Sequence, residues 1–482
     1  MTDHGVIPAG AAQAGAGPAG QPNVVLIIAD QLRRSALGCY GDPNVSTPNI
    51  DALAESGTRF DAASSTYPVC VPFRFSLMTG EHAHTRAIPS IEWRMSPAER
   101  TLADEFNEAG YHTGLFGKWH LYGGFGHLPG HTVVKTSRTH IPRIFQGRWQ
   151  RFAGFDICND PYDTYYFNED DPTPHKIDGY QTDGLFDLAM EWFRQREGHP
   201  FASVLSVEPP HPLFTAPEED LERWRDRELT LRDNVQLDME YRKRGPHGTS
   251  LLDDMRVYYA MIENLDRNIG RLVESLREAN QLDNTVIALT ADHGELLGSH
   301  GLQAKQRPWE ESIGIPLIVS AGDGRVIDDP VCTEDLFPTL LGLAGLAPRD
   351  PKPGLDLTPL IDGQQDELDR EGVLLEFVSE LRPYAPFHEQ TWRGIRTRRH
   401  KYTVLGDAHG GKPWQFFDLR SDPYEMRNLV NNPAYADLAA HHHRLLRERL
   451  VATHDHYVLA PAHGCAGLNE WNPEAKHQQR FG

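Results

Sequence analysis

The sequence predicts an α/β fold in which a large, mixed and mostly parallel sheet is covered by helices on both faces. Three observations predict it. Short, continuous apolar runs rich in β-branched residues are typical of strands buried on both faces. Amphipathic helical segments separate these runs, and strands that alternate with helices indicate a layered α/β sheet. Beyond about residue 365, short strands follow one another without long helices between them.

The apolar runs come first. Residues 24–29 read VVLIIA, and runs of similar character lie at residues 201–207, 286–290 and 315–319. The clearest helix between them has its apolar side chains three and four positions apart. These side chains are Tyr258, Tyr259, Ile262, Leu265, Ile269, Leu272 and Leu276. Residues 335–346 form a second predicted helix. In sheets of this kind, ligands gather at the carboxyl ends of the strands.

The last third of the chain predicts a small antiparallel sheet with one helix. Its strands are expected at residues 372–377, 393–398, 401–405 and 414–419, and its helix at about 435–453. We therefore divide the chain into four parts: a disordered tail at 1–21, a catalytic α/β domain at 22–365, a small α+β domain at 366–460 and a C-terminal arm at 461–482. An arm of this kind is compatible with packing on a neighbouring subunit, so a homo-oligomer is one expectation.

The net charge and the distribution of apolar residues exclude several classes of binding partner. The 482 residues carry a formal net charge of -21, which argues against nucleic acid and against an anionic membrane surface as partners. A small anionic substrate stays compatible, because a metal and a few cations reverse the field locally. The first 22 residues lack the pattern of a signal peptide and no apolar run has transmembrane length, so we expect a cytoplasmic protein.

The number and spacing of the cysteines argue against two further classes of protein. The five cysteines are odd in number, far apart and in no CxxC pair, which argues against a disulfide scaffold or a zinc cluster. They are Cys39, Cys70, Cys158, Cys332 and Cys465.

Polar and charged groups nevertheless recur at places suited to a site. Asp30 and Gln31 follow the first predicted strand, and Asp292 and His293 follow the one at 286–290. Other segments add the remaining candidates, which are Cys70, Arg74, Lys118, His120, His211 and Lys305. A lone cysteine beside a proline is usually a small buried hydrophobe. The set as a whole supplies carboxylates, an amide, imidazoles and cations, which suit a divalent metal and a tetrahedral anion.

Five segments carry a resemblance to a known family. Residues 70–74 (CVPFR) resemble the CxPxR signature of type I sulfatases, and residues 114–121 (GLFGKWHL) resemble their second signature. Residues 261–266, 335–340 and 417–425 are similar to family helices and to the family's C-terminal strand and turn. The resemblance covers roughly residues 22–455 and implies the alkaline-phosphatase-like fold of the formylglycine-dependent sulfatases.

This resemblance implies a modified nucleophile. Cys70 would be oxidised to formylglycine by a separate formylglycine-generating enzyme that reads the CxPxR segment. One hydroxyl of the hydrated aldehyde would attack sulfur and displace the alcohol, and the second would lose its proton and expel sulfate. Phe73 departs from the small residue that the family usually has there.

The resemblance also implies a metal site. Its ligands would be Asp30, Gln31, Asp292, His293 and the oxygen derived from Cys70. Oxygen-rich ligation suits a hard cation, and we expect Ca²⁺, with Mg²⁺ as an alternative. Most sulfatases have Asp where this chain has Gln31 and commonly Asn where it has His293, and both changes favour Mn²⁺ as a further alternative.

The remaining groups would handle the substrate. By family analogy, Lys118 and Lys305 touch sulfate oxygens, Arg74 holds the diol, His120 holds the diol hydroxyl that is deprotonated, and His211 faces the leaving group. Two further histidines are expected at the rim of the pocket: His84 and His300.

These implications leave three functions open. The first is hydrolysis of an anionic small-molecule sulfate ester, either an aryl sulfate or a sugar sulfate, with N-sulfated sugars included. The second is a phosphonate monoester or phosphodiester hydrolase that uses the same site, which the Asp-Gln and Asp-His pairs favour. The third is a silent binding protein on a sulfatase fold, for which Gln31 is the one candidate for a lost ligand.

Overall fold

Eight strands form the main sheet of the computed structural model, which describes residues 21–91, 93–123, 138–196, 198–379, 390–407 and 409–462. The order across the sheet is β11-β2-β10-β9-β1-β8-β4-β5. The bounds are β1 Asn23–Ala29, β2 Thr58–Phe60, β4 His112–Lys118, β5 Arg151–Phe155, β8 Phe201–Val207, β9 Thr285–Ala291, β10 Leu317–Val319 and β11 Arg325–Ile327. The predicted fold class is confirmed.

Strand β1 lies within the parallel part of the sheet, which runs in the order β9-β1-β8-β4-β5. It pairs in parallel with β8 on one side and β9 on the other, so that Leu26 lies opposite Val204 and Ala288. Strand β4 continues the parallel order beyond β8. Strand β1 has an unbroken apolar run from Val24 to Ala29, as expected of a strand buried on both faces.

Strand β10 differs from the three other predicted runs. It begins at Leu317 rather than residue 315, and it pairs antiparallel with both β9 and β2. Pro316 has no N–H group to donate to a strand ladder, so the strand begins after it. The connection from β9 returns to the same edge of the sheet without a long crossover helix, and this sets the antiparallel direction.

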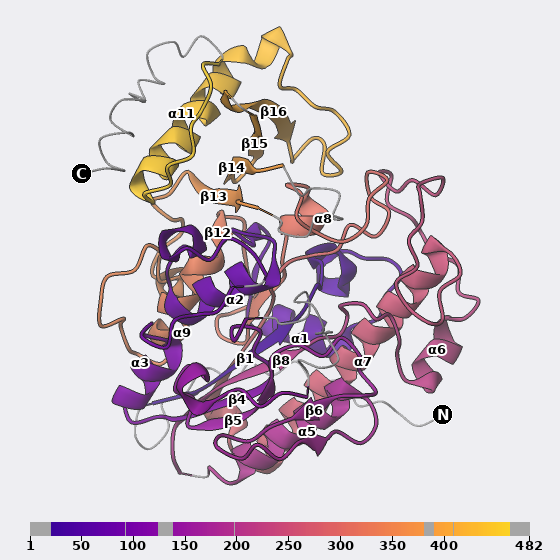
Figure 1. The fold of residues 1–482 in the computed structure, drawn as a ribbon, viewed down its shortest axis with the longest axis vertical. Helices are drawn as coiled ribbons and strands as arrows, with labels where there is room; N and C mark the ends of the chain where they lie inside the picture. Colours follow the sequence, from indigo (N-terminus) through magenta and orange to yellow (C-terminus); the bar gives the residue numbers. More distant parts are fainter. Residues whose placement is uncertain are drawn as a thin grey trace.

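Helices form two groups (Figure 1). Helices α1, α5 and α6 each contact α7, and α2, α3 and α9 contact one another in the second group. Their bounds are α1 Pro48–Ser56, α2 Cys70–Thr79, α3 Leu102–Glu108, α5 Gln181–Arg194, α6 Glu218–Trp224, α7 Leu251–Glu278, α8 Glu310–Ile313, α9 Leu336–Gly342 and α10 Thr358–Ile361. Helix α7 begins where the Ser250 side chain accepts a hydrogen bond from the Asp253 N–H, and its predicted apolar stripe is buried.

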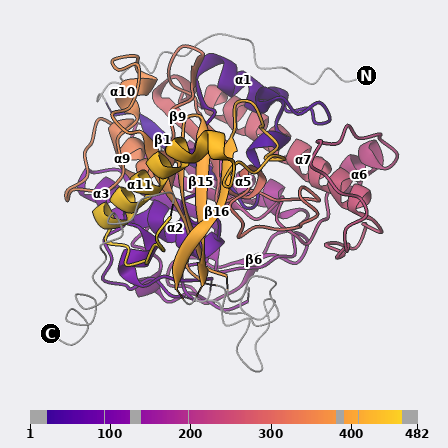
Figure 2. The ribbon, with the colours of Figure 1, turned by 90° about the horizontal axis from the view of Figure 1, so that it is seen from above.

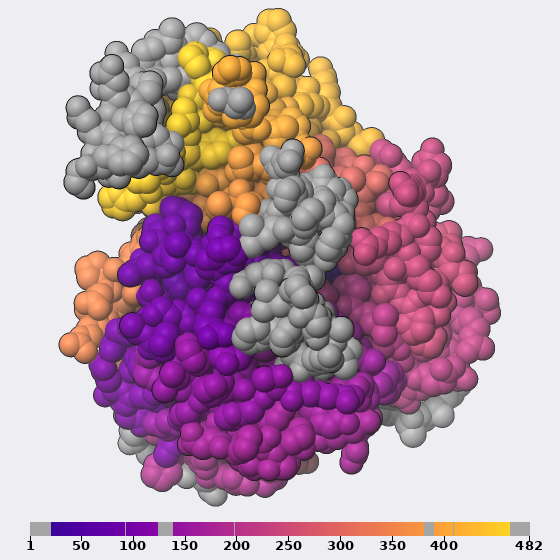
Figure 3. Space-filling view, viewed as in Figure 1, coloured from indigo at the N-terminus to yellow at the C-terminus, as the bar shows by residue number. Residues whose placement is uncertain are grey.

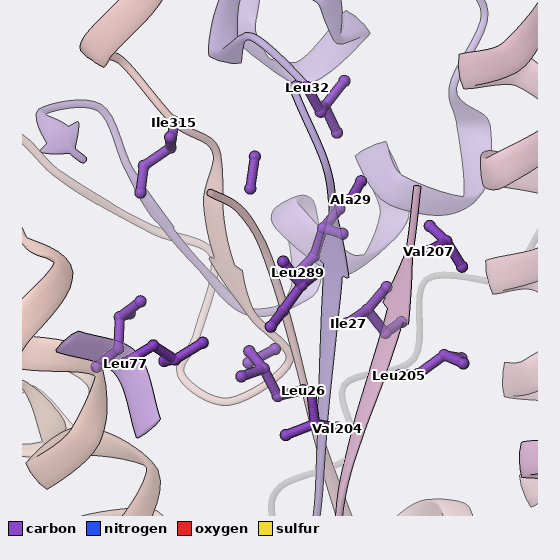
Figure 4. Packing of buried hydrophobic residues seen from close by; sticks show 14 of the residues in the cluster. Leu26, Ile27, Ala29, Leu32, Leu77, Val204, Leu205, Val207, Leu289 and Ile315 are labelled. Carbon is purple, nitrogen blue, oxygen red and sulfur yellow. The ribbon is translucent and has the colours of Figure 1, made fainter. Parts of the chain in front are cut away.

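The main core lies along the central strands. Figure 4 shows Ile27, Leu205 and Leu289, which lie opposite one another on neighbouring strands, and Leu26 and Leu77 close by. Because successive side chains of a strand alternate, Leu26 and Ile27 pack on opposite faces of the sheet. All five side chains are buried. Burial of large apolar side chains on both faces of the sheet fixes the strand ends that follow them, because the packed interior leaves little room for adjustment.

The C-terminal part is an antiparallel sheet with one helix, as predicted. Its strands are β13 Gly372–Phe377, β14 Trp392–Thr397, β15 His400–Asp407 and β16 Gly410–Asp418, and they pair in chain order. Helix α11, Ala436–Ala452, contacts this sheet, as Figure 2 also shows. Figure 3 shows this part, coloured orange to yellow, stacked on the larger body. Short pairings complete the described strands: β3 Ala63–Ser64 with β12 Val331–Cys332, and β6 Tyr165–Tyr166 with β7 His175–Lys176.

The C-terminal strands contribute side chains to both hydrophobic cores. Leu375, Phe377 and Trp392 belong to the main core, whereas Ile395 and Tyr402 belong to a second core under α11. The boundary at residue 365 stays a prediction. The tail and the arm lie almost entirely outside the described residues. No helix in the described parts of the chain combines the length and the apolar character needed to cross a membrane.

We expect Leu289→Ala to lower the free energy of unfolding by about 2–5 kcal/mol, because it leaves a cavity in a packed core. Urea unfolding followed by tryptophan fluorescence would measure the change. Val451→Ala is the control, since Val451 is 64% exposed on α11, and it should stay within about 0.5 kcal/mol of the parent. Equal effects of the two substitutions would contradict the central place of β9 in the core.

Candidate active site and metal centre

The carboxyl ends of four parallel strands supply the floor of the site. Asp30 follows β1, Asp292 follows β9, Glu208 follows β8 and Lys118 is the last residue of β4. Because β9, β1, β8 and β4 are adjacent and parallel, these side chains meet at one edge of the sheet.

Cys70 is the first residue of α2 and is buried above this edge. Its Sγ lies 3.2 Å from Nε2 of His293 and 3.8 Å from Oδ1 of Asp30. The ligand atoms of Asp30, Cys70, Asp292 and His293 all lie within 4.8 Å of one another. Four of the five predicted metal-site residues are thus brought together by strands and a helix that are far apart in the sequence.

Gln31, the fifth, faces the same cluster. Its backbone is left-handed, with φ 67°; its N–H donates to Oδ1 of Asp292 at 3.0 Å, and its carbonyl accepts from the Tyr258 hydroxyl at 2.8 Å. Its side-chain NH₂ donates to Glu295. Its Oε1 accepts from Nζ of Lys305 at 3.3 Å, so the amide oxygen is the atom turned towards the site.

His293 presents a lone pair to the cluster. Its Nδ1 donates to the carbonyl of Gly294 at 3.0 Å, which leaves Nε2 as an acceptor 3.3 Å from Oδ1 of Asp292. Burial lowers the pKa of His293 to about 4, although Asp292 opposes this shift. The imidazole is therefore neutral near pH 7, which is the form that a metal ion binds.

The donor set fits a divalent cation. The Lys305 ammonium occupies a cation position among these lone pairs, 2.9 Å from Sγ of Cys70 and 2.8 Å from Nε2 of His293. Two carboxylates, an amide oxygen and an imidazole nitrogen suit Ca²⁺, Mg²⁺ or Mn²⁺. The residues present thus match the metal site that the sequence predicts.

Arg74 contacts residues at the ends of four strands. Its Nη1 donates to Oγ of Ser206 at 2.7 Å and to the carbonyl of Lys118 at 3.1 Å. Its Nη2 lies 3.5 Å from Oδ2 of Asp30 and 3.4 Å from Oδ2 of Asp292. A planar guanidinium can serve several acceptors at once, which a lysine in its place could not.

Lys118 and Asp30 form a buried ion pair with 2.5 Å between Nζ and Oδ2. Burial raises the pKa of Asp30, but Lys118, His211 and Lys305 together hold it well below its ordinary value. For Lys118, burial lowers the pKa, and Asp30 and Glu208 raise it above its ordinary value. Both groups therefore stay charged near neutral pH.

His120 and His211 are the candidates for proton transfer. Burial, with Lys118 and Arg74, lowers the pKa of His120 well below its ordinary value, and among the described residues its Nδ1 has no hydrogen-bond partner. Burial also lowers the pKa of His211, while the nearby Asp30 opposes that shift. Nδ1 of His211 forms a hydrogen bond with the carbonyl of Pro212. Both imidazoles are neutral near pH 7 and can accept a proton.

Sequence reasoning missed several supporting residues. Glu208 receives the N–H groups of Cys158 and Asn159 at 2.9 and 2.8 Å and lies 3.5 Å from Nζ of Lys118. It directly follows a buried strand, as Asp30 does, and this signal could have found it. Ser206 and Glu295 carry no such local signal.

The two histidines expected at the rim lie in other clusters. Nδ1 of His84 is 2.7 Å from Oε2 of Glu376, and its Nε2 donates to the carbonyl of Thr453 at 2.9 Å. His300 stacks on Trp309 with 3.8 Å between ring centroids. Their contacts link the larger body to the C-terminal part rather than to Cys70.

Comparison with known proteins agrees with this geometry. The sulfatase family model matches residues 22–346, and the model for the C-terminal region of N-sulphoglucosamine sulphohydrolase matches residues 298–452. The ulvan-active sulfatase of Formosa agariphila is 30% identical over 454 residues, which cover 91% of this chain and 82% of that protein.

Solved structures give the same picture. The sulfatase-like protein yidJ of Bacteroides fragilis superposes with a TM-score of 0.79 at 27% identity, over 90% of this chain and 97% of that one. The phosphonate monoester hydrolase of Agrobacterium radiobacter shares the fold, with a TM-score of 0.71 at 24% identity, over 90% of this chain and 96% of that one.

The chain belongs to the sulfatase family, whose members are sulfuric ester hydrolases. The resemblance stated from the sequence motifs is confirmed, and so is the assignment as an enzyme. The amide oxygen of Gln31 faces Lys305, which itself contacts Cys70 and His293.

A pH dependence of stability follows from His84. Burial lowers its pKa, but Glu376 and Asp455 outweigh burial and raise it to about 9. Because the folded pKa is above the unfolded value of about 6.5, the stabilisation is fully present below about pH 6.5 and is lost as pH rises through about 9. The melting temperature of the parent should therefore fall more steeply over this window than that of His84→Gln, which cannot titrate. Parallel curves would contradict the ion pair.

Proposed function

We propose that this chain hydrolyses sulfate esters through a formylglycine derived from Cys70, with one divalent metal held by Asp30, Gln31, Asp292 and His293. The observation that carries the proposal is the position of Sγ of Cys70, in contact with both His293 and Lys305 at the first turn of α2. A side chain at this position is within reach of metal ligands and of cations that suit a sulfate group.

The metal ion and the formylglycine would each supply a different kind of chemistry. When bound, the metal would polarise oxygen atoms and neutralise negative charge. A hydrated formylglycine would supply a hydroxyl nucleophile and a second hydroxyl that allows the residue to be regenerated. The chain's own residues do the remaining work of binding, orienting and proton transfer.

The cations bind and orient the anion. Lys118 contacts Asp30 and Lys305 contacts Cys70, and we assign both lysines to sulfate oxygens. Arg74 holds the carboxylates of Asp30 and Asp292 in place. With a divalent cation added, the charges of that ion, Arg74, Lys118 and Lys305 outnumber those of the four carboxylates Asp30, Glu208, Asp292 and Glu295. The site would therefore attract an anion although the whole chain is acidic.

The neutral histidines handle protons. We assign His120 as the base that removes a proton from the hydroxyl at position 70, because its lowered pKa keeps a ring nitrogen free to accept one. We place His211 on the side of the leaving alcohol, where it would exchange a proton with that oxygen.

The substrate class that we propose is a carbohydrate sulfate ester, and aryl sulfates serve as test substrates. Support comes from the relative named as an ulvan-active sulfatase, which matches along 91% of this chain. A phosphonate monoester is the second candidate, because Gln31 and His293 resemble the ligand pattern of phosphonate monoester hydrolases. Comparing kcat/KM for an aryl sulfate and a phenyl phosphonate monoester would decide between them, and higher turnover of the phosphonate would overturn our choice.

The modification has a direct test. In protein produced with a formylglycine-generating enzyme, we expect the tryptic peptide of residues 60–74 to show the mass deficit of converting CH₂SH to an aldehyde. Cys70→Ala is the matched control and should lack both the deficit and sulfatase activity. An intact thiol in active protein would overturn the proposed nucleophile.

Metal removal provides a second test. Dialysis against a chelator should reduce hydrolysis of an aryl sulfate by at least about 100-fold, since the proposed metal neutralises charge at the reacting group. Adding back Ca²⁺, Mg²⁺ or Mn²⁺ separately should restore the rate and identify the preferred ion. Full activity in protein shown by elemental analysis to be metal-free would contradict the proposal.

A further inference from the structure

Glu295 is a fully buried carboxylate two residues beyond His293. Its Oε1 accepts the N–H of Leu297 at 3.0 Å and the N–H of Ala304 at 2.5 Å. Its Oε2 accepts the side-chain NH₂ of Gln31. Every one of these partners is a donor, which matches a carboxylate because it accepts at both oxygens and donates at neither.

This arrangement decides how the Gln31 amide is turned. A glutamine side chain has one acceptor oxygen and one donor nitrogen, and the two are interchangeable by a half-turn. With its NH₂ bound by Glu295, the oxygen must point the other way, towards Lys305 and the candidate metal ligands. The Tyr258 hydroxyl fixes the backbone carbonyl of the same residue.

Glu295 also fixes the segment that precedes Lys305. It binds the N–H of Ala304, and the Ala304 carbonyl accepts the N–H of Leu296 at 2.8 Å. Nη2 of Arg244 lies 3.4 Å from Oε2 and compensates the buried charge. One carboxylate thus orients Gln31 and positions the neighbour of Lys305.

We propose that Glu295 is a positioning residue that makes Gln31 a metal ligand. Glu295 would turn the amide oxygen of Gln31 towards the metal. It would also place a negative charge directly behind Gln31, at a position where most sulfatases have an aspartate as the ligand itself. The inference rests on the proposed function, because it requires a metal at Asp30, Gln31, Asp292 and His293.

Glu295→Gln tests the orientation. The new amide must keep its oxygen towards the N–H groups of Leu297 and Ala304, so its NH₂ faces Gln31. Gln31 must then turn its own oxygen towards that NH₂ and its nitrogen towards the metal. We expect the dissociation constant for Mn²⁺, measured on the full chain from the free Mn²⁺ signal in electron paramagnetic resonance, to rise about 10–100-fold.

The reciprocal exchange tests the cause. In the double variant Glu295→Gln with Gln31→Glu, the carboxylate at position 31 accepts from the new amide and offers its other oxygen to the metal. We expect Mn²⁺ affinity to return to within about threefold of the parent, in the manner of a compensated double-mutant cycle. A merely structural role for Glu295 would give no such recovery.

A matched control and the melting temperature complete the experiment. Glu334→Gln removes a charge from another buried glutamate, which contacts Thr66 and His82, and should leave Mn²⁺ affinity unchanged. Thermal unfolding shows which variants are folded. If Glu295→Gln does not fold, the Mn²⁺ affinity of the double variant decides the outcome. Parental affinity in Glu295→Gln, or no recovery in the folded double variant, overturns this inference alone. If the parent binds no Mn²⁺ in a buffer free of Ca²⁺, the proposed metal site is overturned as well.

Discussion

Burial of charge at one edge of a parallel sheet is the constraint on which the rest of the site depends. Asp30, Asp292 and Lys118 are placed there by strands whose apolar side chains fill the core, and the described structure leaves all three almost without solvent. A buried charge without a partner costs several kcal/mol, so each must be compensated locally. Arg74 and the ion pair between Lys118 and Asp30 provide that compensation.

The same compensation prepares the site for chemistry. The nearby cations lower the pKa of Asp30 and keep it ionised, while burial lowers the pKa of His120 and His293 and keeps both imidazoles neutral. Hydrogen-bond donors and acceptors are therefore already in place before a substrate binds. The lone pairs around Sγ of Cys70 then converge on one point. An acidic chain can therefore hold an anion, because the local field differs in sign from the net charge.

A second level of hydrogen bonds controls the atoms that face this point. Ser206 holds Arg74, Glu208 holds Lys118, and Glu295 holds Gln31. Each of these partners comes from a strand end or the loop that follows it. On our proposal, Gln31 serves as a metal ligand where most sulfatases have an aspartate, because the neighbouring Glu295 carboxylate orients its amide and supplies a nearby negative charge.

The sequence by itself determined the strand runs, the helical stripe of α7, the C-terminal antiparallel sheet and the candidate ligand residues that follow buried strands, because these are signals of local spacing. The tertiary structure alone decided the antiparallel direction of β10, the contacts of His84 with Glu376 and of His300 with Trp309, and the orientation of the Gln31 amide. These depend on partners such as Glu295, which is more than 260 positions from Gln31. Contacts between such distant positions leave no periodic pattern in the chain, so only the packed fold reveals them.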